Sequence, residues 1–269
     1  GVGKSVLLGM IARHTEAQVN VIGLIGERGR EVREFIERDL GEGIKNSVVI
    51  VATSDQPPLI RVRGAFLTIA IAEYFRDRGM DVLLLMDSLT RFGMAQREIG
   101  LAIGEPPTSK GYTPSVFSLL TKLLERAGNG DGEGTMTGIY TVLVEGDDLD
   151  DPIADSSRAI LDGHIVLSRR LTDMNQYPPV DVMRSISRIM KDIVSKDQIE
   201  YSSRIIEILS EYERAEDLIN IGAYIPGNNK KIDYAMSMID RVRTFLSQNV
   251  DEKVTLEESL NSMKILFYV

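Results

Sequence analysis

The chain has 269 residues, 43% of them hydrophobic and 26% charged, so it can bury one large core or two unequal ones. Its 31 Lys and Arg against 40 Asp and Glu give a net charge of −9, which disfavours a sequence-independent grip on nucleic acid, since that grip needs clustered basic side chains. The absence of cysteine excludes disulfides, thiol nucleophiles and cysteine metal sites, and no apolar run approaches the ~18 residues of a membrane span.

Short apolar runs alternate with helical patterns through the first two thirds of the chain. Strands are predicted at residues 19–26, 47–52, 81–87, 138–144 and 164–168. Helices are predicted at residues 4–14, 32–39, 63–78, 91–101, 115–126 and 152–162. Continuously apolar strands are typical of a parallel sheet covered on both faces. The alternating order implies right-handed crossovers, so we predict an open, doubly wound α/β sheet.

The pattern changes after about Asp192, beyond which we predict helices and no strand. One long segment after residue 200 places its apolar residues largely on one helical face. Further on, Thr255 and Glu258 form a capping box ahead of another helix, and residues 222–233 read as a turn. We therefore predict a core domain over residues 1–192 and a small all-helical domain over residues 193–269, with the boundary near residues 191–195.

The first residues, GVGKS, match the end of a phosphate-binding loop, G-x-x-x-x-G-K-[ST], whose first glycine would precede Gly1. In that interpretation backbone N–H groups surround a nucleotide phosphate, Lys4 reaches the β- and γ-phosphate oxygens, and the Ser5 hydroxyl binds Mg²⁺. The candidate nucleotide-binding residues are Gly1, Val2, Gly3, Lys4, Ser5 and Val6. Five residues fit a glycine-rich entry to an ordinary helix equally well, so the motif alone leaves both interpretations open.

The stretch VLLLMDS places Asp87 at the C-terminal end of a predicted buried strand, which is the edge where open α/β sheets bind ligands. A phosphate loop needs such an acid to position Mg²⁺ and its waters. An Asp after a strand is also a common cap or turn residue. The GKS motif some 80 residues earlier favours the first interpretation, so Ser5 and Asp87 are the predicted metal-side residues.

Two further candidates are weaker on the residues alone. The stretch GLIGERGRE places Glu27 at another strand end, beside Arg28, where a carboxylate could align a water against a γ-phosphate. A solvated charge run is the usual explanation for such a cluster, but the other two motifs favour the catalytic one. Arg188, in SISRIM, could reach the phosphate of a neighbouring subunit or pair with an acid, and the residues alone favour the ion pair.

The motifs, taken in order, resemble a known family. They are GVGKS, GERGREVREF, VLLLMDSLTRF, MAQREIGLAIGEPP, GYTPSVFSLLTKLLERAG, TVLVEGDDLDDPIAD, ILDGHIVLSR and SISRIM. Essentially the whole chain is similar to the flagellar protein-export ATPases, relatives of the catalytic β subunit of the rotary ATP synthases. The resemblance implies a RecA-like phosphate-loop core with a mostly parallel sheet, followed by a small helical domain. Members carry an N-terminal segment and a β-barrel domain before the loop, so we expect this chain alone to bind nucleotide poorly and not to form rings.

The resemblance implies a role for each of the motifs in the core. It assigns Lys4 and Ser5 to phosphate and Mg²⁺ binding, and Asp87 to the Mg²⁺ side of the site. It makes Glu27 the catalytic carboxylate and Arg28 a neighbour of the γ-phosphate. These roles agree with the interpretation that the residues favour when taken together.

The resemblance also implies the parts of the assembly. Tyr177, in NQYPPVD, matches the aromatic residue that packs on adenine, and Arg188 matches the arginine supplied across a subunit interface, which reverses the ion-pair interpretation. The implied protein is a homo-hexamer that hydrolyses ATP with Mg²⁺ in the cytoplasm, at the inner face of the inner membrane, peripheral to the export gate. Its implied partners are a coiled-coil stalk protein, a regulatory stator-like protein, export substrates and their chaperones, and no nucleic acid.

Three alternatives stay open at this point. The ATPase of a virulence (injectisome) type III secretion system shares the same plan. A non-catalytic nucleotide-binding subunit would lack the carboxylate at Glu27, and a transcription-terminator type of helicase would need basic loops that follow nucleic acid. The loop YIPGNNKK, with Lys230 and Lys231, either contacts a stalk protein or the export gate inside the ring or is an ordinary solvated turn.

Overall fold

The computed structural model describes residues 2–148 and 150–268. The chain divides into two compact units, one over Lys4–Leu161 and the other over Asp162–Val269 together with Gly1–Gly3. This division falls earlier in the chain than the predicted domain boundary at residues 192 and 193. Because a compact unit is not the same quantity as an independently folding domain, that boundary stays a prediction.

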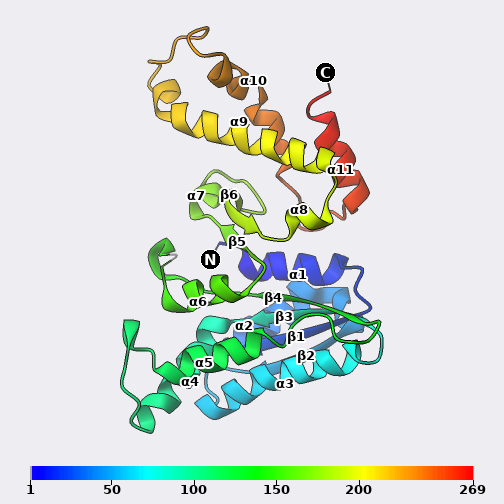
Figure 1. Cartoon of the computed structure of the whole chain (residues 1–269), viewed down its shortest axis with the longest axis vertical. Coiled ribbons are helices and arrows are strands. Elements are labelled where there is room, and N and C mark those ends of the chain that lie inside the picture. Colours follow the sequence, from blue (N-terminus) through cyan, green and yellow to red (C-terminus); the bar gives the residue numbers. More distant parts are fainter. Residues whose placement is uncertain (1, 149, 269) are drawn as a thin grey trace. The chain divides into compact units, whose positions relative to one another are not determined.

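The first unit is built on a four-stranded parallel sheet with the order β2-β1-β3-β4 (Figure 1). Its strands are β1 (Val19–Ile25), β2 (Ser47–Ala52), β3 (Asp81–Asp87) and β4 (Thr135–Tyr140). Its α-helices are α1 (Lys4–His14), α2 (Gly29–Glu34), α3 (Pro58–Arg76), α4 (Leu89–Ala102), α5 (Pro114–Leu124) and α6 (Pro152–Ile160). Shorter helical segments are the π-helix η1 (Phe35–Leu40) and the 3₁₀ segments η2 (Gly41–Asn46), η3 (Ser109–Gly111) and η4 (Glu145–Asp147). The predicted α/β core with a parallel sheet is thereby confirmed.

Side chains of β1 and β3 alternate between two apolar clusters, one on each face of the sheet. Val21 and Leu84 belong to the cluster completed by α3, α4 and α5. Ile22 and Leu85 belong to the cluster completed by α1, α2 and η1. Figure 1 shows α1 and α3 on opposite sides of the strands. Burial on both faces explains why these two strands are continuously apolar in sequence.

Three helices begin earlier than the sequence predicted, because residues at their starts favour a helix N-terminus. Pro58 and Pro114 lie in the first turns of α3 and α5, where the missing N–H of proline costs nothing. The Ser88 side chain caps α4 by accepting a backbone N–H. The predicted helix at residues 32–39 is wrong in its bounds, because the chain there is divided between α2 and the π-helix η1.

The fourth strand also lies earlier than predicted, at Thr135–Tyr140 instead of residues 138–144. Its pairing with β3 ends where Met86 lies beside Tyr140, at the carboxyl edge of the sheet. Beyond that edge the backbone N–H of Leu143 donates to Thr90 Oγ1 at 2.8 Å, so this N–H has a side chain as its partner instead of a strand. A run of apolar residues therefore predicted the strand without locating its end.

Gly23 marks a close approach of α3 to the sheet. A Cβ atom on this residue would lie 2.6 Å from Thr68 Oγ1, far inside van der Waals contact. Thr68 is buried, and its hydroxyl donates to the Gly64 carbonyl oxygen at 2.8 Å, so the side chain is held in place. The strand needs glycine at this position because the helix packs directly on the backbone.

The second unit begins with a two-stranded antiparallel sheet of β5 (Gly163–Leu167) and β6 (Val180–Ser187). The sequence predicted β5 as a member of the parallel sheet, which is wrong, and it missed β6. Val180, Val182 and Ile186 alternate with other residues in β6, and this period of two was the available signal. The half-exposed hairpin lacks the continuous apolar run of a strand that is buried on both faces.

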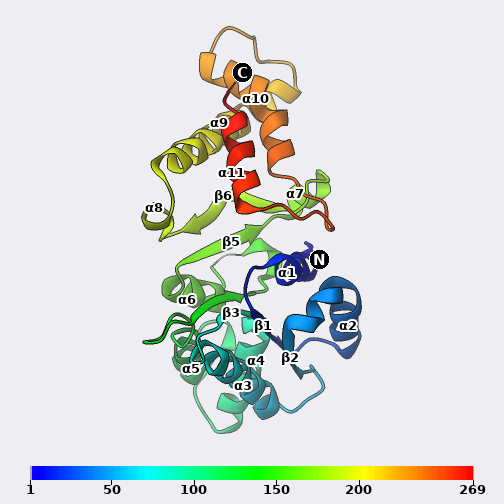
Figure 2. The same ribbon diagram turned by 90° about the vertical axis from the view of Figure 1, so that its right-hand side faces the viewer.

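Helices make up the rest of the second unit (Figure 2). They are α7 (Arg169–Asp173), α8 (Met190–Ile193), α9 (Lys196–Asn220), α10 (Lys230–Phe245) and α11 (Leu256–Ile265). Ile208 of α9, Val242 of α10 and Leu266 beyond α11 form a third apolar cluster. The predicted capping box of Thr255 and Glu258 is confirmed at the start of α11. No helix among the described residues is long and apolar enough to span a membrane.

The predicted turn at residues 222–233 ends four residues early. Asn229 caps α10 by accepting the backbone N–H of Lys231 at 2.9 Å, so Lys230 and Lys231 lie in the first helical turn. The remaining loop is closed by Asp233, whose carboxylate accepts hydrogen bonds from the Tyr224 hydroxyl and the Gly227 backbone. Asn is a common helix cap, so Asn229 was an available signal for the end of the turn that the prediction did not use.

Candidate functional site

Three of the predicted site residues meet at the carboxyl ends of β1 and β3. Lys4 is the first residue of α1, Glu27 lies just beyond β1, and Asp87 is the last residue of β3. Lys4 Nζ donates to Asp87 Oδ1 at 2.5 Å and lies 3.8 Å from Glu27 Oε1. The three side chains are only 18%, 12% and 6% exposed, in that order. One partly buried cation therefore faces the partly buried Glu27 and the buried Asp87, at the edge where α/β sheets bind ligands.

The turn from β1 to Glu27 depends on Gly26. This residue has φ +75°, and its backbone N–H donates to the Ala52 carbonyl oxygen at 2.7 Å. A Cβ atom on it would lie 2.6 Å from Cβ of Arg91, so both its conformation and the space require glycine. The turn at Gly26 directs Glu27 towards Lys4 and Asp87. Arg91 of α4 packs against the same turn.

Burial, and after it the nearby negative charge of Asp87, are the main causes that raise the pKa of Glu27 to about 7. The positive charge of Lys4 opposes the rise, a hydrogen bond with Glu31 adds to it, and Arg91 opposes it weakly. Glu27 Oε1 is buried and makes no hydrogen bond within the described residues. A carboxylate with a pKa near neutral and an unused oxygen is suited to accepting a proton.

Asp87 is held by two donors at the same oxygen. Lys4 Nζ donates to Oδ1, and Thr141 Oγ1 donates to it at 2.7 Å. Thr141 directly follows β4, which pairs with β3. Sequence reasoning missed both Thr141 and Arg91, although a hydroxyl residue at the carboxyl end of the neighbouring strand was a usable signal for the first.

The phosphate-loop residues lie at and before the start of α1. Gly1 lies outside the described residues, Gly3 has φ +83°, and Ser5 and Val6 belong to the first turn of the helix. The first backbone N–H groups of an α-helix lack partners within the helix and favour anions. The eleven-residue helix α1 therefore presents such groups next to Lys4.

The remaining predicted residues are not part of the buried cluster. Arg28 is 70% exposed and lies 3.5 Å from Glu31. Tyr177 and Arg188 are exposed and belong to the second compact unit. The carbonyl oxygen of Tyr177 accepts the backbone N–H of Gln248 at 2.8 Å, and Arg188 directly follows β6. The predicted roles of all three stay predictions.

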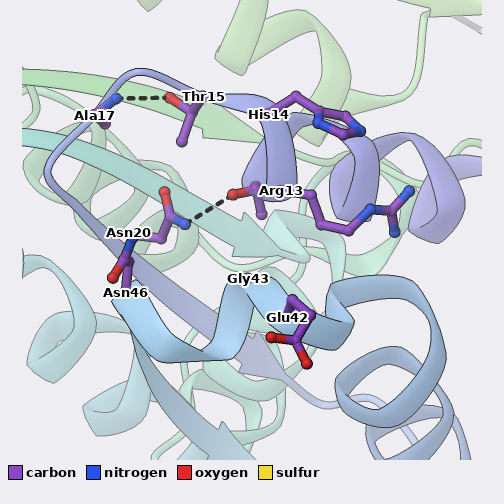
Figure 3. A pocket seen from close by; sticks show the side chains of 9 residues that line it. Arg13, His14, Thr15, Ala17, Asn20, Glu42, Gly43 and Asn46 are labelled. Carbon is purple, nitrogen blue, oxygen red and sulfur yellow. Dashed lines mark hydrogen bonds between the residues drawn. The ribbon is translucent and has the colours of Figure 1, made fainter. Parts of the chain in front are cut away.

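A separate pocket of about 250 Å³ lies at the other end of α1 (Figure 3). Its lining includes Arg13, His14, Asn20, Glu42 and Asn46. Asn20 Nδ2 donates to the Ala12 carbonyl oxygen at 3.0 Å, which joins the end of the helix to β1. Eleven helical residues span about 16 Å, so the pocket is distant from Lys4. The pocket has none of the three residues of the buried cluster, which stays the candidate site.

A parallel sheet covered on both faces, with a lysine at the start of a helix against acids at two strand ends, defines a RecA-like nucleotide-binding core. Sequence comparison identifies the protein family within this class. The chain belongs to the ATP synthase alpha/beta family, whose nucleotide-binding domain matches residues 1–187. Residues 194–265 match the C-terminal domain of the type III secretion ATPase EscN. The resemblance predicted from the motifs is thereby confirmed.

Individual relatives carry two kinds of name, one for the flagellum and one for a type 3 secretion system. The flagellum-specific ATP synthase of Bacillus subtilis is 58% identical over 99% of this chain and 61% of its own length. The type 3 secretion system ATPase of Xanthomonas euvesicatoria is 54% identical over 97% of this chain and 59% of its own. The assembled ATPase EscN from enteropathogenic E. coli superposes with a TM-score of 0.93 at 43% identity, covering 99% of this chain and 64% of that one. The chain spans about three fifths of the length of these curated relatives.

Proposed function

We propose that the protein containing this chain hydrolyses ATP and uses the energy to drive flagellar protein export. The observation that carries the proposal is the buried cluster of Lys4, Glu27 and Asp87 at the carboxyl edge of the sheet, in a chain of the ATP synthase alpha/beta family. A purely non-catalytic nucleotide-binding subunit has no need of the buried carboxylate at Glu27.

The start of α1 provides the phosphate-binding part of the mechanism. Lys4 and the first N–H groups of α1 would bind the phosphate oxygens. Lys4 has a full positive charge and the helix N-terminus a partial one, and both lie at the carboxyl edge of the sheet, where Lys4 is partly buried. The oxygens of Ser5 and Asp87 are of the type that Mg²⁺ prefers, so these two residues would hold it together with waters and phosphate. The ion, when bound, neutralises developing charge on the phosphates.

Glu27 provides the proton-accepting part of the mechanism. Its pKa near 7 leaves a large share of the side chain ionised at neutral pH, and its Oε1 makes no hydrogen bond within the described residues. We propose that this carboxylate orients the attacking water in line with the γ-phosphate and takes its proton. Burial makes the same carboxylate a stronger base than a solvated one.

The other predicted residues require an assembly. We propose that Arg188 of one subunit stabilises the γ-phosphate bound to its neighbour, that Arg28 lies close to that phosphate, and that Tyr177 packs on adenine. Support comes from the exposure of Arg188 and Tyr177 and from the relative EscN, which has been solved as an assembled ATPase. We propose a homo-hexamer located at the cytoplasmic side of the inner membrane, next to the export gate.

The helical region offers the surface for a stalk. EscN has also been solved in complex with its central stalk EscO, and that structure matches 99% of this chain at a TM-score of 0.91. We propose that the loop before α10 contacts a coiled-coil stalk protein, with Lys230 and Lys231 at its edge. Lys231 Nζ lies 2.8 Å from Glu207 Oε1, so Lys230 is the better residue for charge reversal. Lys230→Glu should weaken stimulation by the stalk while basal hydrolysis persists, and undiminished stimulation would reduce the loop to a turn.

The remaining partners follow from the same proposal: a stator-like regulator, export substrates and their chaperones. A virulence type III secretion ATPase is a second candidate, because the relative from Xanthomonas euvesicatoria is as similar as the flagellum-specific relative from Salmonella typhimurium, each at 54% identity. Flagellar genes next to the coding sequence would favour the first function, and genes for a needle complex would favour the second.

The direct test uses the full-length protein. Glu27→Gln should keep nucleotide affinity and reduce turnover by about 10²-fold or more, the scale of lost general-base help. Fluorescent-nucleotide binding and phosphate release measure the two quantities side by side. Near-normal turnover in the variant contradicts the role of Glu27, and no ATP hydrolysis by the wild type contradicts the proposed function.

A mixing experiment tests Arg188. Arg188→Ala keeps the carboxylate, and Glu27→Gln keeps the arginine, so mixing both before assembly creates some interfaces with both groups intact. Random mixing in equal amounts should make about a quarter of the interfaces competent. Activity well above that of either variant supports an arginine acting between subunits. A linked dimer with one defined intact interface removes the dependence on random mixing, and an inactive linked dimer that still assembles would refute it.

A further inference from the structure

The Thr141 hydroxyl donates a hydrogen bond to Asp87 that has no role in the proposed mechanism of hydrolysis. We propose that Thr141 is a positioning residue, whose hydroxyl keeps the Asp87 carboxylate oriented while Lys4 is engaged by bound phosphate. The inference rests on the proposed function, because it concerns the same ATP site. It adds the residue directly after β4 to a cluster otherwise formed by α1 and the ends of β1 and β3.

The hydroxyl of Thr141 has one preferred acceptor. Oγ1 lies 2.7 Å from Asp87 Oδ1 and 3.5 Å from the Met86 carbonyl oxygen. A hydroxyl carries a single proton, and the shorter contact to a carboxylate is the stronger bond. Thr141 and Asp87 are both buried, so little water competes for this bond.

The backbone holds this donor in place. The N–H of Thr141 donates to the Met86 carbonyl oxygen at 3.0 Å, directly beyond the last β3–β4 pair. Threonine is also restricted at χ1, so little rotamer freedom is lost in aiming the hydroxyl. The donor therefore belongs to the sheet, whereas the other donor belongs to a long, flexible lysine side chain.

The two donors differ in what ligand binding does to them. Lys4 is a cation at the start of α1, and phosphate oxygens compete with Asp87 for its ammonium group. Thr141 is neutral and attached to β4, so a phosphate has no comparable attraction for it. A buried carboxylate that loses one donor needs the other in order to stay in its rotamer. The Asp87 carboxylate thus keeps one fixed partner in both the empty and the occupied site.

A change in the orientation of the Asp87 carboxylate would affect both Glu27 and the binding of Mg²⁺. The negative charge of Asp87 is one cause of the raised pKa of Glu27, so its position affects the proposed base. It is also the proposed oxygen ligand on the Mg²⁺ side. Loss of the Thr141 hydroxyl should therefore alter the Mg²⁺ requirement and the pH profile, which a role in packing alone would leave unchanged.

The test compares three variants of the full-length protein. Thr141→Val keeps the shape and removes the hydroxyl, Thr141→Ser keeps the hydroxyl, and Thr137→Val is the control, an exposed threonine on the same strand. In Thr141→Val we expect kcat to fall by about 10- to 100-fold, the range of a lost charge-assisted hydrogen bond. We expect the Mg²⁺ concentration for half-maximal rate to rise, with ATP affinity in the absence of Mg²⁺ unchanged. Thr141→Ser and Thr137→Val should stay within a few-fold of wild type.

Each outcome decides between the explanations. A Thr141→Val protein with wild-type kcat and Mg²⁺ dependence overturns the inference, as does a serine variant as impaired as the valine one. A fall in kcat with an unchanged Mg²⁺ requirement and pH profile also overturns it, because that indicates a packing defect. Where Thr141→Val does not fold, Thr141→Cys, with its weak donor, replaces it under the same expectations. A wild type without ATPase activity refutes the proposed function, whereas an active wild type with an unaffected Thr141→Val refutes only this inference.

Discussion

Replacing Glu27 by Gln should stabilise the folded chain above neutral pH, at the very position where it removes the proposed base. Burial and the charge of Asp87 outweigh the attraction of Lys4, so the ionised carboxylate is disfavoured in the folded state. Glutamine resembles the protonated acid in shape and carries no charge. The variant therefore avoids the cost of burying a charge next to Asp87.

The magnitude follows from the two pKa values. The folded pKa of Glu27 is about 7, against 4.5 for an exposed glutamate, and a tenfold change in an equilibrium constant is about 1.4 kcal/mol. Between these values the folded state binds more protons than the unfolded state, so the free energy of unfolding falls as pH rises. Below pH 4.5 the carboxyl group is protonated in both states and the cost is absent. Above pH 7 the cost reaches about 3 kcal/mol.

Denaturant unfolding of this chain, followed by circular dichroism, measures the effect at pH 5 and pH 8. The stability gain of Glu27→Gln should grow by about 2 to 3 kcal/mol between the two conditions. Glu16→Gln is the matched control, because Glu16 is exposed and forms no ion pair within the described residues. A gain that is absent at pH 8, or equal at both pH values, would show that the carboxylate is not disfavoured by its surroundings.

Three further outcomes are expected. In the full-length protein kcat/KM should rise with pH and be half-maximal near pH 7, as the raised pKa of Glu27 requires; a rate independent of pH from 6 to 8 contradicts this. Gly23→Ala should cost about 1 to 3 kcal/mol through its clash with Thr68, and adding Thr68→Ala should restore part of it; additive losses in denaturant unfolding would exclude the clash. Thr255→Ala should lower stability by about 1 kcal/mol and speed amide exchange in α11, whereas unchanged exchange would show that the capping box contributes little.

The local sequence pattern was sufficient to predict most of the strands of the parallel core. Strands β1, β2 and β3 and helix α1 are where short-range signals placed them, because continuous apolar runs and helix periodicity report burial directly. Motif spacing located Lys4, Glu27 and Asp87, since parallel strands carry their carboxyl ends to one edge. The capping box at Thr255 was readable for the same reason, as its two partners are three residues apart.

What the local pattern missed depends on partners far away in the chain. Three features depend on segments that are too far apart for one window of sequence to contain both. They are the pairing of β5 with β6, the end of the β3–β4 pairing at Tyr140, and the hydrogen bond from Thr141 to Asp87. The pKa of Glu27 belongs to the same group, because burial and the charges of Asp87 and Lys4 exist only once strands and helix have packed. Residue type and spacing can therefore name the chemistry of the site. The raised pKa of Glu27, the proposed base, and the donors that hold Asp87 come from non-local packing.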